Sequence, residues 1–264
     1  QKSLWIDKQN IDALLGIGLC FYHLEEFNDA VSAFRKTLKI DPYNYIAYYY
    51  LGLALMTEDN FREAIPNLTQ SLLLNPDNSD IYFNLGKSYF ETSKIIQARE
   101  AFNRTITIDP QHGPAYYYIG LINENIMEID KAVHAYAQAQ KYSPEIEDVH
   151  YRLGMLLYRT GELKKAMEPL RQYIINQPDD QHVLEVMGEI FISENRFPEA
   201  IDTYNRILGI YPEKLETSLA LAESHYQLKE LDDAINVYQN ILLFDDENYE
   251  VMIRMGSVYN ELGE

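Results

Sequence analysis

Residue types that act as nucleophiles, general bases or metal ligands are present in this sequence, but they do not gather into a motif. The six histidines are scattered, and there is no HExxH pair, no glycine-rich phosphate loop and no nucleophile elbow. The single cysteine, Cys20, excludes an internal disulfide and a cysteine-rich metal site. Its place beside Phe21 predicts a buried, unreactive thiol. We therefore predict a protein that is not an enzyme and has no catalytic residue, cofactor or metal.

Composition and charge narrow the class of protein further. The chain has 264 residues, of which 47% are hydrophobic and 24% charged, as expected for a folded protein. The net charge of −19 repels phosphate backbones and anionic lipids, which argues against nucleic acid as a partner. The longest nearly apolar run, residues 45–56, is too short to cross a bilayer, so direct membrane insertion is not expected. A single cysteine fits a reducing compartment without requiring one. The sequence does not identify the compartment, although a soluble cytoplasmic protein is favoured.

The strongest pattern in the sequence is an internal repeat. The stretch AYYYLG at residues 47–52 returns as AYYYIG at residues 115–120, and IYFNLG at residues 81–86 lies halfway between them. The spacing from each of these copies to the next is the period of the repeat. In this frame glycine recurs at positions 18, 52, 86, 120, 154, 188 and 256, and Ala222 takes the remaining place. Alanine recurs with the same period at positions 30, 64, 98, 132, 166, 200 and 234, and proline at positions 42, 76, 110, 144, 178 and 212.

Hydrophobic residues within each unit are spaced as in two short helices. In residues 45–78, for example, Tyr48, Leu51 and Leu55 share one helical face, and a second apolar stripe begins at Phe61. A polar turn at residues 57–60 separates the two stripes, which predicts an antiparallel helix pair. Small residues of the two helices, such as Gly52, let the backbones approach closely, and the proline after the second helix ends it.

This 34-residue unit, with its aromatic residue, Leu-Gly, alanine and proline, resembles the tetratricopeptide repeat, or TPR. The resemblance covers essentially the whole chain. It implies an all-α fold, an α-solenoid of helix-turn-helix repeats that form a right-handed superhelix. Seven full repeats are predicted in one solenoid domain that belongs to a longer protein: residues 11–44, 45–78, 79–112, 113–146, 147–180, 181–214 and 215–248. Residues 1–10 match the tail of a preceding repeat, and residues 249–264 match the first helix of a further one.

The resemblance also implies where a partner binds, because the first helix of each repeat lines a concave groove in this family. The inward positions of this chain are mostly aromatic or apolar, which predicts a groove that binds a protein segment with an apolar stripe. The predicted groove residues are Leu19, Tyr49, Tyr50, Leu53, Phe83, Asn84, Lys87, Tyr117, Tyr118, Leu121, Tyr151, Arg152 and Met155.

Packing between neighbouring first helices is the competing explanation for some of these aromatic residues. Tyr49, Tyr117 and Tyr151 occupy a repeat position where aromatic residues are common in the family. Packing between helices explains them as well as binding of a partner does. Tyr50 and Tyr118 are better candidates, because polar residues are usual at their position. Two other ligand modes of the family are disfavoured, since neither the lysine, arginine and asparagine set of a carboxylate clamp nor a ladder of asparagines is present.

Acidic residues dominate the second half of the chain. Residues 133–264 carry a net charge of −13, against −6 for residues 1–132. Several carboxylates occupy inward positions and form a predicted acidic groove wall: Glu185, Glu189, Glu216 and Glu223. An acidic run is commonly just a solvated face, but carboxylates that share one wall predict a basic end on the bound segment.

The sequence thus predicts a scaffold or adaptor that binds a protein segment and organises a multiprotein assembly. One alternative is a structural component that associates with itself through open solenoid ends. Another is a targeting or regulatory arm of a longer enzyme. Nothing in the sequence identifies the partner or the pathway.

Overall fold

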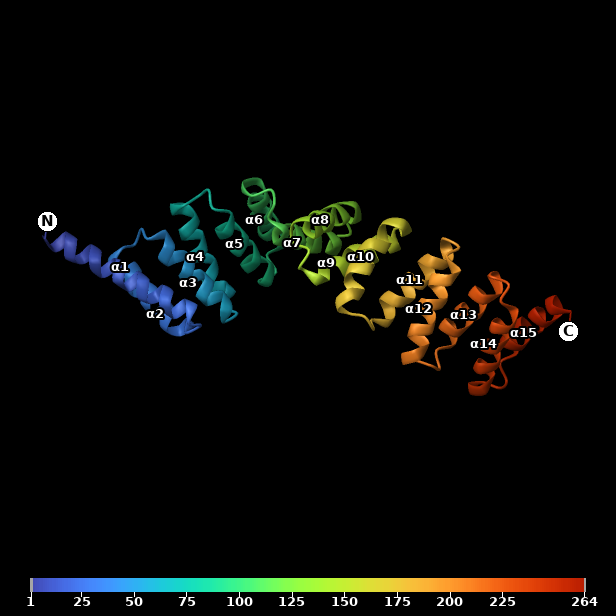
Figure 1. Cartoon of the computed structure of the whole chain (residues 1–264). Helices are drawn as coiled ribbons and strands as arrows, with labels where there is room; N and C mark the ends of the chain where they lie inside the picture. Colours follow the sequence, from blue (N-terminus) through green and yellow to red (C-terminus); the bar gives the residue numbers. More distant parts are fainter. Residues whose placement is uncertain (1, 264) are drawn as a thin grey trace. The chain divides into compact units, whose positions relative to one another are not determined.

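The computed structural model describes residues 2–263, and in this part of the chain all regular structure is helical (Figure 1). Two compact units divide the chain, Gln1–Ile146 and Glu147–Glu264. The first unit contains α1 (Lys2–His23), α2 (Phe27–Ile40), α3 (Tyr45–Thr57), α4 (Phe61–Leu74), α5 (Ser79–Glu91), α6 (Ile95–Ile108), α7 (Gly113–Asn125) and α8 (Ile129–Tyr142). The second contains α9 (Glu147–Arg159), α10 (Leu163–Asn176), α11 (Gln181–Ser193), α12 (Phe197–Ile210), α13 (Leu215–Gln227), α14 (Leu231–Phe244) and α15 (Tyr249–Leu262).

The all-α repeat fold expected from the sequence is confirmed, and consecutive helices pack as antiparallel pairs. From α3 onward, every odd-numbered helix begins at the first residue of a predicted repeat. We expected one solenoid domain, whereas the structure divides into two compact units after Ile146. The sequence repeat continues unchanged across this division. Since each repeat of a solenoid contacts only its neighbours, a division can fall at any repeat junction without changing that pattern.

The N-terminal helix differs from the predicted arrangement. α1 continues without a break across the expected boundary between residues 10 and 11. Lys8 stands where the following repeats carry a proline, and a lysine amide can continue the helical hydrogen-bond ladder. The side chains of residues 1–10, on which the assignment of this segment to an earlier repeat rests, lie outside the described part of the chain.

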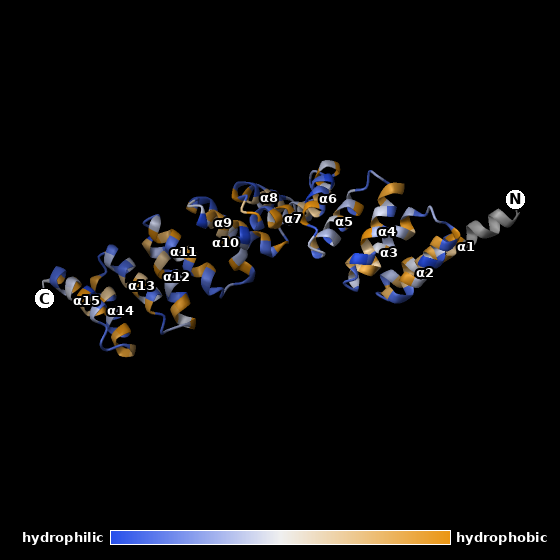
Figure 2. Ribbon diagram, turned by 180° about the vertical axis from the view of Figure 1, so that it is seen from behind, coloured by the Kyte–Doolittle hydropathy of each residue, from blue (hydrophilic) through white to orange (hydrophobic). Residues whose placement is uncertain are grey.

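Local signals at the helix ends recur with the period of the sequence repeat. Asn44, Asn78 and His112 each accept a hydrogen bond from the backbone amide three residues ahead, and so cap α3, α5 and α7. Asp180 and Asn248 cap α11 and α15 in the same way. The turn inside each pair has one left-handed residue, with φ between 56° and 79°, at positions 25, 59, 93, 127, 161, 195 and 229. Figure 2 shows that these connections are mostly hydrophilic.

The recurring glycine fixes how closely the two helices of a pair approach. A Cβ atom added to Gly86 would lie 2.8 Å from the ring of Phe102, and one added to Gly120 would lie 2.4 Å from the ring of Tyr136. In four other repeats the distance to a large side chain of the paired helix is similar: 2.6 Å at Gly18, 2.7 Å at Gly52, 2.5 Å at Gly154 and 2.5 Å at Gly188. The glycine is therefore required by packing, because any side chain would overlap its neighbour.

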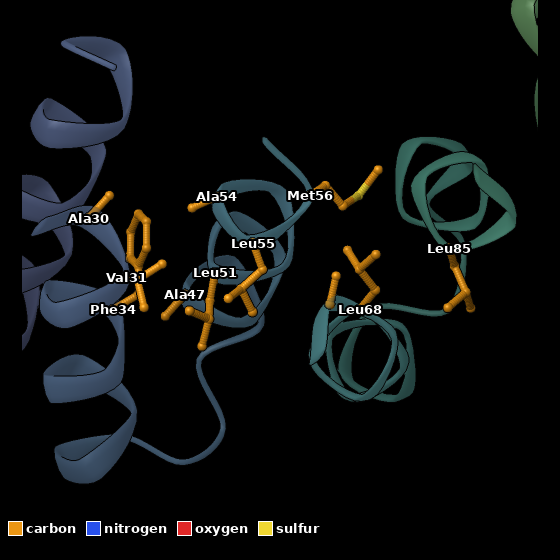
Figure 3. Close-up of a cluster of buried hydrophobic side chains, with 11 residues drawn as sticks. Ala30, Val31, Phe34, Ala47, Leu51, Ala54, Leu55, Met56, Leu68 and Leu85 are labelled. Atoms are coloured by element: carbon orange, nitrogen blue, oxygen red, sulfur yellow. The ribbon is translucent and has the colours of Figure 1, made fainter. Parts of the chain in front are cut away.

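Apolar side chains from successive pairs form continuous cores within each unit. In the first unit, side chains of α2, α3 and α4 and Leu85 of α5 meet in one cluster (Figure 3). A further cluster gathers around Phe102 and Ile122, both almost fully buried. In the second unit, Tyr238 and Val251 belong to a cluster that joins α13, α14 and α15. Each repeat is thus stabilised mainly by burial against its neighbours.

The prediction of a buried thiol was wrong, because Cys20 is exposed. Equivalent positions in later repeats, such as Ala54 and Ser88, are fully buried. Ala54, for example, packs in one cluster with side chains of α2. Within the same part of the chain, no helix combines the length and the apolar character needed to cross a bilayer.

A matched pair of glycine substitutions tests the packing role of the glycine. We expect Gly86→Ala to lower the free energy of unfolding by about 1–3 kcal/mol, because the new methyl group overlaps Phe102. Gly16→Ala, also inside a helix of the first unit, meets nothing within 4 Å and is expected to be neutral or to gain up to about 1 kcal/mol from helix propensity. Urea unfolding followed by circular dichroism measures both, and equal effects would contradict this account.

Candidate protein-binding faces

The first candidate face lies on the odd-numbered helices of the first unit, and we call it the aromatic face. It consists of side chains that are all half-buried: Tyr49, Tyr50, Phe83, Tyr117 and Tyr118, with Tyr22 and Phe90 beside them. Neighbouring helices are linked along it, because Tyr22 of α1 contacts Tyr50 of α3 edge to face with ring centroids 5.3 Å apart. Asn84 of α5 lies close to Tyr49 of α3, with its Nδ2 3.3 Å from the tyrosine Oη.

Tyr50 and Tyr118 each cover a phenylalanine of the preceding second helix. The Tyr118 ring stacks on Phe102 with centroids 4.9 Å apart and an interplanar angle of 12°. Tyr50 stacks on Phe34 at 6.0 Å and 29°. One face of each ring is therefore used for packing between repeats, and the remaining surface is available to a partner.

This stacking explains why the aromatic hexamer of residues 47–52 returns two repeats later, at residues 115–120, and not in the repeat between them. The pairs Phe34 with Tyr50 and Phe102 with Tyr118 have the same spacing along the chain. The intermediate repeat has Leu68 in place of a phenylalanine, and Asn84 in place of the tyrosine.

Asn84 takes part in its own helix instead of covering a ring. Its side-chain amide donates a hydrogen bond to the backbone carbonyl of Asp80 at 2.8 Å. Leu68, which stands where Phe34 and Phe102 stand in their repeats, is fully buried. From residue 34 to residue 118, a phenylalanine followed by a tyrosine thus alternates with a leucine followed by an asparagine.

Other predicted residues of the first unit have different surroundings. Leu19 and Leu53 pack against the core cluster of α2 to α4. Leu121 is half-buried and lies one helical turn from Tyr117 and Tyr118. Lys87 has no hydrogen-bond or ion-pair partner among the described residues, so its ammonium is free to meet a partner's acidic or carbonyl group.

In the second unit, the predicted groove residues of α9 are tied to their own neighbours. The Tyr151 ring contacts Tyr173 of α10 with centroids 5.2 Å apart. Arg152 forms an ion pair with Asp148, one turn earlier on the same helix. Met155 is half-buried on the same helix. Tyr151 and Arg152 are therefore each held by a neighbour within the second unit.

The second candidate face is a small acidic pocket in the second unit. A cavity of about 340 Å³ is lined by Glu185, Glu189, Tyr204, Lys214, Glu216, Thr217 and Ala220. Three of the four residues of the predicted acidic wall thus meet in one place. The fourth, Glu223, does not line the cavity and accepts a hydrogen bond from Gln227 at 2.7 Å.

Lys214, Tyr204 and Ala220 were not predicted as site residues, and each shapes the acidic pocket. The Lys214 ammonium pairs with Glu185, which neutralises one of the three carboxylates. Tyr204 comes from α12, whose sequence pattern marks it only as a core residue. Repeat position alone could have located Ala220, because it is the counterpart of Tyr50 and Tyr118.

Burial raises the pKa of several phenols on these faces. The pKa of Tyr204 rises to about 12, chiefly because the side chain is desolvated and secondarily because the negative charge of Glu189 lies nearby. Desolvation likewise raises the pKa of Tyr118, with a smaller contribution from Glu91. At neutral pH these side chains are therefore uncharged hydroxyls that can both donate and accept hydrogen bonds.

Potential ligands of a metal ion meet once in the described part of the chain, at His225, Glu230 and Asp233. The Nδ1 atom of His225 lies 2.7 Å from a carboxylate oxygen of Glu230. Both carboxylates are exposed, and exposed acidic groups are common on protein surfaces without a metal. We assign this cluster no role in metal binding.

Comparison with sequence families identifies the repeat. Tetratricopeptide repeat profiles match residues 55–119 and 191–264, residues 128–181 and residues 12–42. The chain belongs to the tetratricopeptide repeat family. A comparison with curated protein sequences gave no match.

Solved structures of other TPR proteins share the fold. A structure entitled "Crystal structure of MamA" has 25% sequence identity and a TM-score of 0.56, and the match covers 61% of this chain and 95% of that one. PilF of Pseudomonas aeruginosa has 19% identity and a TM-score of 0.61, over 82% of this chain and 99% of its own. YrrB, described as a TPR protein with an unusual peptide-binding site, has 16% identity and a TM-score of 0.59, over 71% and 96% of the two chains.

The raised pKa of Tyr204 gives a test of its burial. Below pH 10 the phenol is protonated in both the folded and the unfolded states, so its contribution to stability is constant. Between pH 10 and about 12 the unfolded state loses this proton first, and the free energy of unfolding falls. We expect urea unfolding to show a smaller alkaline decline for Tyr204→Phe than for the parent. Identical declines in the two proteins would show that Tyr204 titrates normally.

Proposed function

We propose that this protein is a non-enzymatic scaffold that binds a segment of another protein along the odd-numbered helices. The observation that carries the proposal is the aromatic face of the first unit, where half-buried rings follow one another across α1, α3, α5 and α7. Aromatic side chains supply large contact area at low entropic cost and are enriched at protein interfaces. Contiguous apolar surface of this kind marks interaction sites more often than it serves stability alone.

The chemistry of the two faces favours a partner segment with an apolar part and a basic part. The aromatic face offers rings and phenolic hydroxyls, whereas the acidic pocket of the second unit offers carboxylates. Solved relatives are consistent with binding of this kind: YrrB is described as having a peptide-binding site, and Naa15 with Naa10 is seen bound to HypK. Neither relative identifies the partner of this chain.

Loss of one apolar side chain from the aromatic face tests the proposal. The parent protein is crosslinked in the cells that produce it, captured partners are identified, and the best candidate is purified and titrated by calorimetry. We expect Leu121→Glu to weaken that binding by about tenfold or more, because a carboxylate then replaces apolar contact beside Tyr117 and Tyr118. Leu121 is chosen because Tyr50 and Tyr118 also pack between repeats, so their substitution would disturb the fold.

Leu73→Glu is the matched control. Leu73 is 72% exposed and lies on α4, an even-numbered helix of the same unit, so the same charge is added away from the aromatic face. Both variants should keep the helical circular dichroism and melting temperature of the parent. Equal binding by parent and Leu121→Glu, a greater loss with Leu73→Glu, or recovery of the chain itself as the only captured species would overturn the proposal.

A further inference from the structure

The acidic pocket lies where a small residue stands in place of the tyrosines that cover a neighbouring ring in two repeats of the first unit. In the first unit, Tyr50 covers Phe34 and Tyr118 covers Phe102. In the second unit, the residue at the equivalent place after Tyr204 is Ala220, whose methyl group leaves the space open. The cavity of about 340 Å³ lies there, with Tyr204 and Ala220 both in its lining. This is enough volume for the end of one side chain, although it is small for a drug-sized ligand.

The side chain of Tyr204 is buried and lines the cavity. It is 3% exposed, and among the described residues no group is hydrogen-bonded to its hydroxyl. Tyr136 at the same repeat position differs, because its hydroxyl donates to Glu124 at 2.6 Å. The hydroxyl of an otherwise buried side chain that lines a cavity without a protein partner can accept and donate hydrogen bonds to a group that enters from outside.

The charge of the pocket defines that group. Three carboxylates and one ammonium line the cavity, a net charge of −2. Glu185 is paired with Lys214, and Glu189 accepts a hydrogen bond from Tyr158. Glu216 has no hydrogen-bond or ion-pair partner among the described residues. The pocket already holds one ammonium and retains enough negative charge to compensate for the desolvation of a second cation.

We propose that the acidic pocket takes the guanidinium group of an arginine side chain from the bound protein segment. The group donates to the hydroxyl of Tyr204 and to the carboxylates of Glu189 and Glu216. A guanidinium has five N–H donors in a planar fork and remains charged when desolvated, whereas an ammonium has three donors and is more strongly hydrated. The inference rests on the proposed function, since it names the residue type that anchors the basic part of the partner.

A capped tripeptide isolates the pocket from the rest of the binding surface. The full chain is labelled with ¹³C in its tyrosine rings, and acetyl-Ala-Arg-Ala-amide is titrated at low salt while the Tyr204 signal, assigned by its absence in Tyr204→Phe, is followed by NMR. The control peptide has citrulline in place of arginine, which keeps the shape and removes the charge. We expect saturable binding of the arginine peptide with a Kd on the order of 1 mM, and binding about tenfold weaker for citrulline.

Protein variants then locate the binding. Ala220→Tyr should abolish the titration, because the new ring fills the cavity as Tyr50 and Tyr118 do in their repeats. Should this variant not fold, Glu216→Gln, which changes an exposed side chain, is expected to weaken binding about tenfold. Tyr136→Phe is the matched control, because it removes a hydroxyl that already has a partner and lies in the other unit. That variant should leave the titration unchanged.

Three results would overturn the inference: no saturation of the Tyr204 signal, equal binding of the arginine and citrulline peptides, or unchanged binding by both Ala220→Tyr and Glu216→Gln. A lysine peptide that binds as tightly as the arginine peptide would refute the preference for a guanidinium. None of these results touches the proposed function, because the peptide lacks apolar side chains. Failure of the proposed function appears instead in the Leu121→Glu comparison with the purified partner.

Discussion

The contact between a glycine of the first helix and a large side chain of the second determines the geometry of every complete repeat but one. Where Gly120 meets Tyr136, a single methyl group would lie 2.4 Å from the ring. This contact brings two helix backbones close enough for the alanine of the second helix to be fully buried, as Ala132 is. Since repeats are stabilised by burial against their neighbours, an error in one pair would spread to the pairs on either side.

The large side chain of the second helix also contacts the first helix of the next repeat, and so affects the surface that this helix offers to a partner. A phenylalanine at this position is covered by a tyrosine of the following helix, as in Phe102 and Tyr118, and the first unit acquires its aromatic face in this way. Tyr204 is followed by Ala220 instead, and a pocket remains. Binding surface and core are therefore not separate parts of this protein. A tyrosine in the space between repeats gives a partner an aromatic ring to contact, whereas an alanine in the same place leaves a cavity.

Much of the fold was predictable from the sequence because one short period is repeated so often. The starts of the helices, the turn residues and the small residues of each pair all follow from it. Exposure was harder to predict: Cys20 is exposed although its counterparts Ala54 and Ser88 are buried, because burial depends on the neighbouring helices and not on repeat position alone. The predicted groove residues were chosen by repeat position, which gives the helical face and not the neighbour. Whether the ring of Tyr50 is free or stacked on Phe34 depends on a residue of the previous repeat.

The sequence by itself determined the family, the helical period and the residue types of the two faces, because these depend on local spacing along the chain. Only the tertiary structure decided which side chains meet. It brought Glu185, Glu189 and Glu216 to one cavity, left Glu223 outside it, and placed the side chain of Tyr204 in its lining. The physical reason is that a pocket is a property of packed volume. Its existence depends on the size of several side chains from three helices at once, and no single repeat of the sequence contains that information.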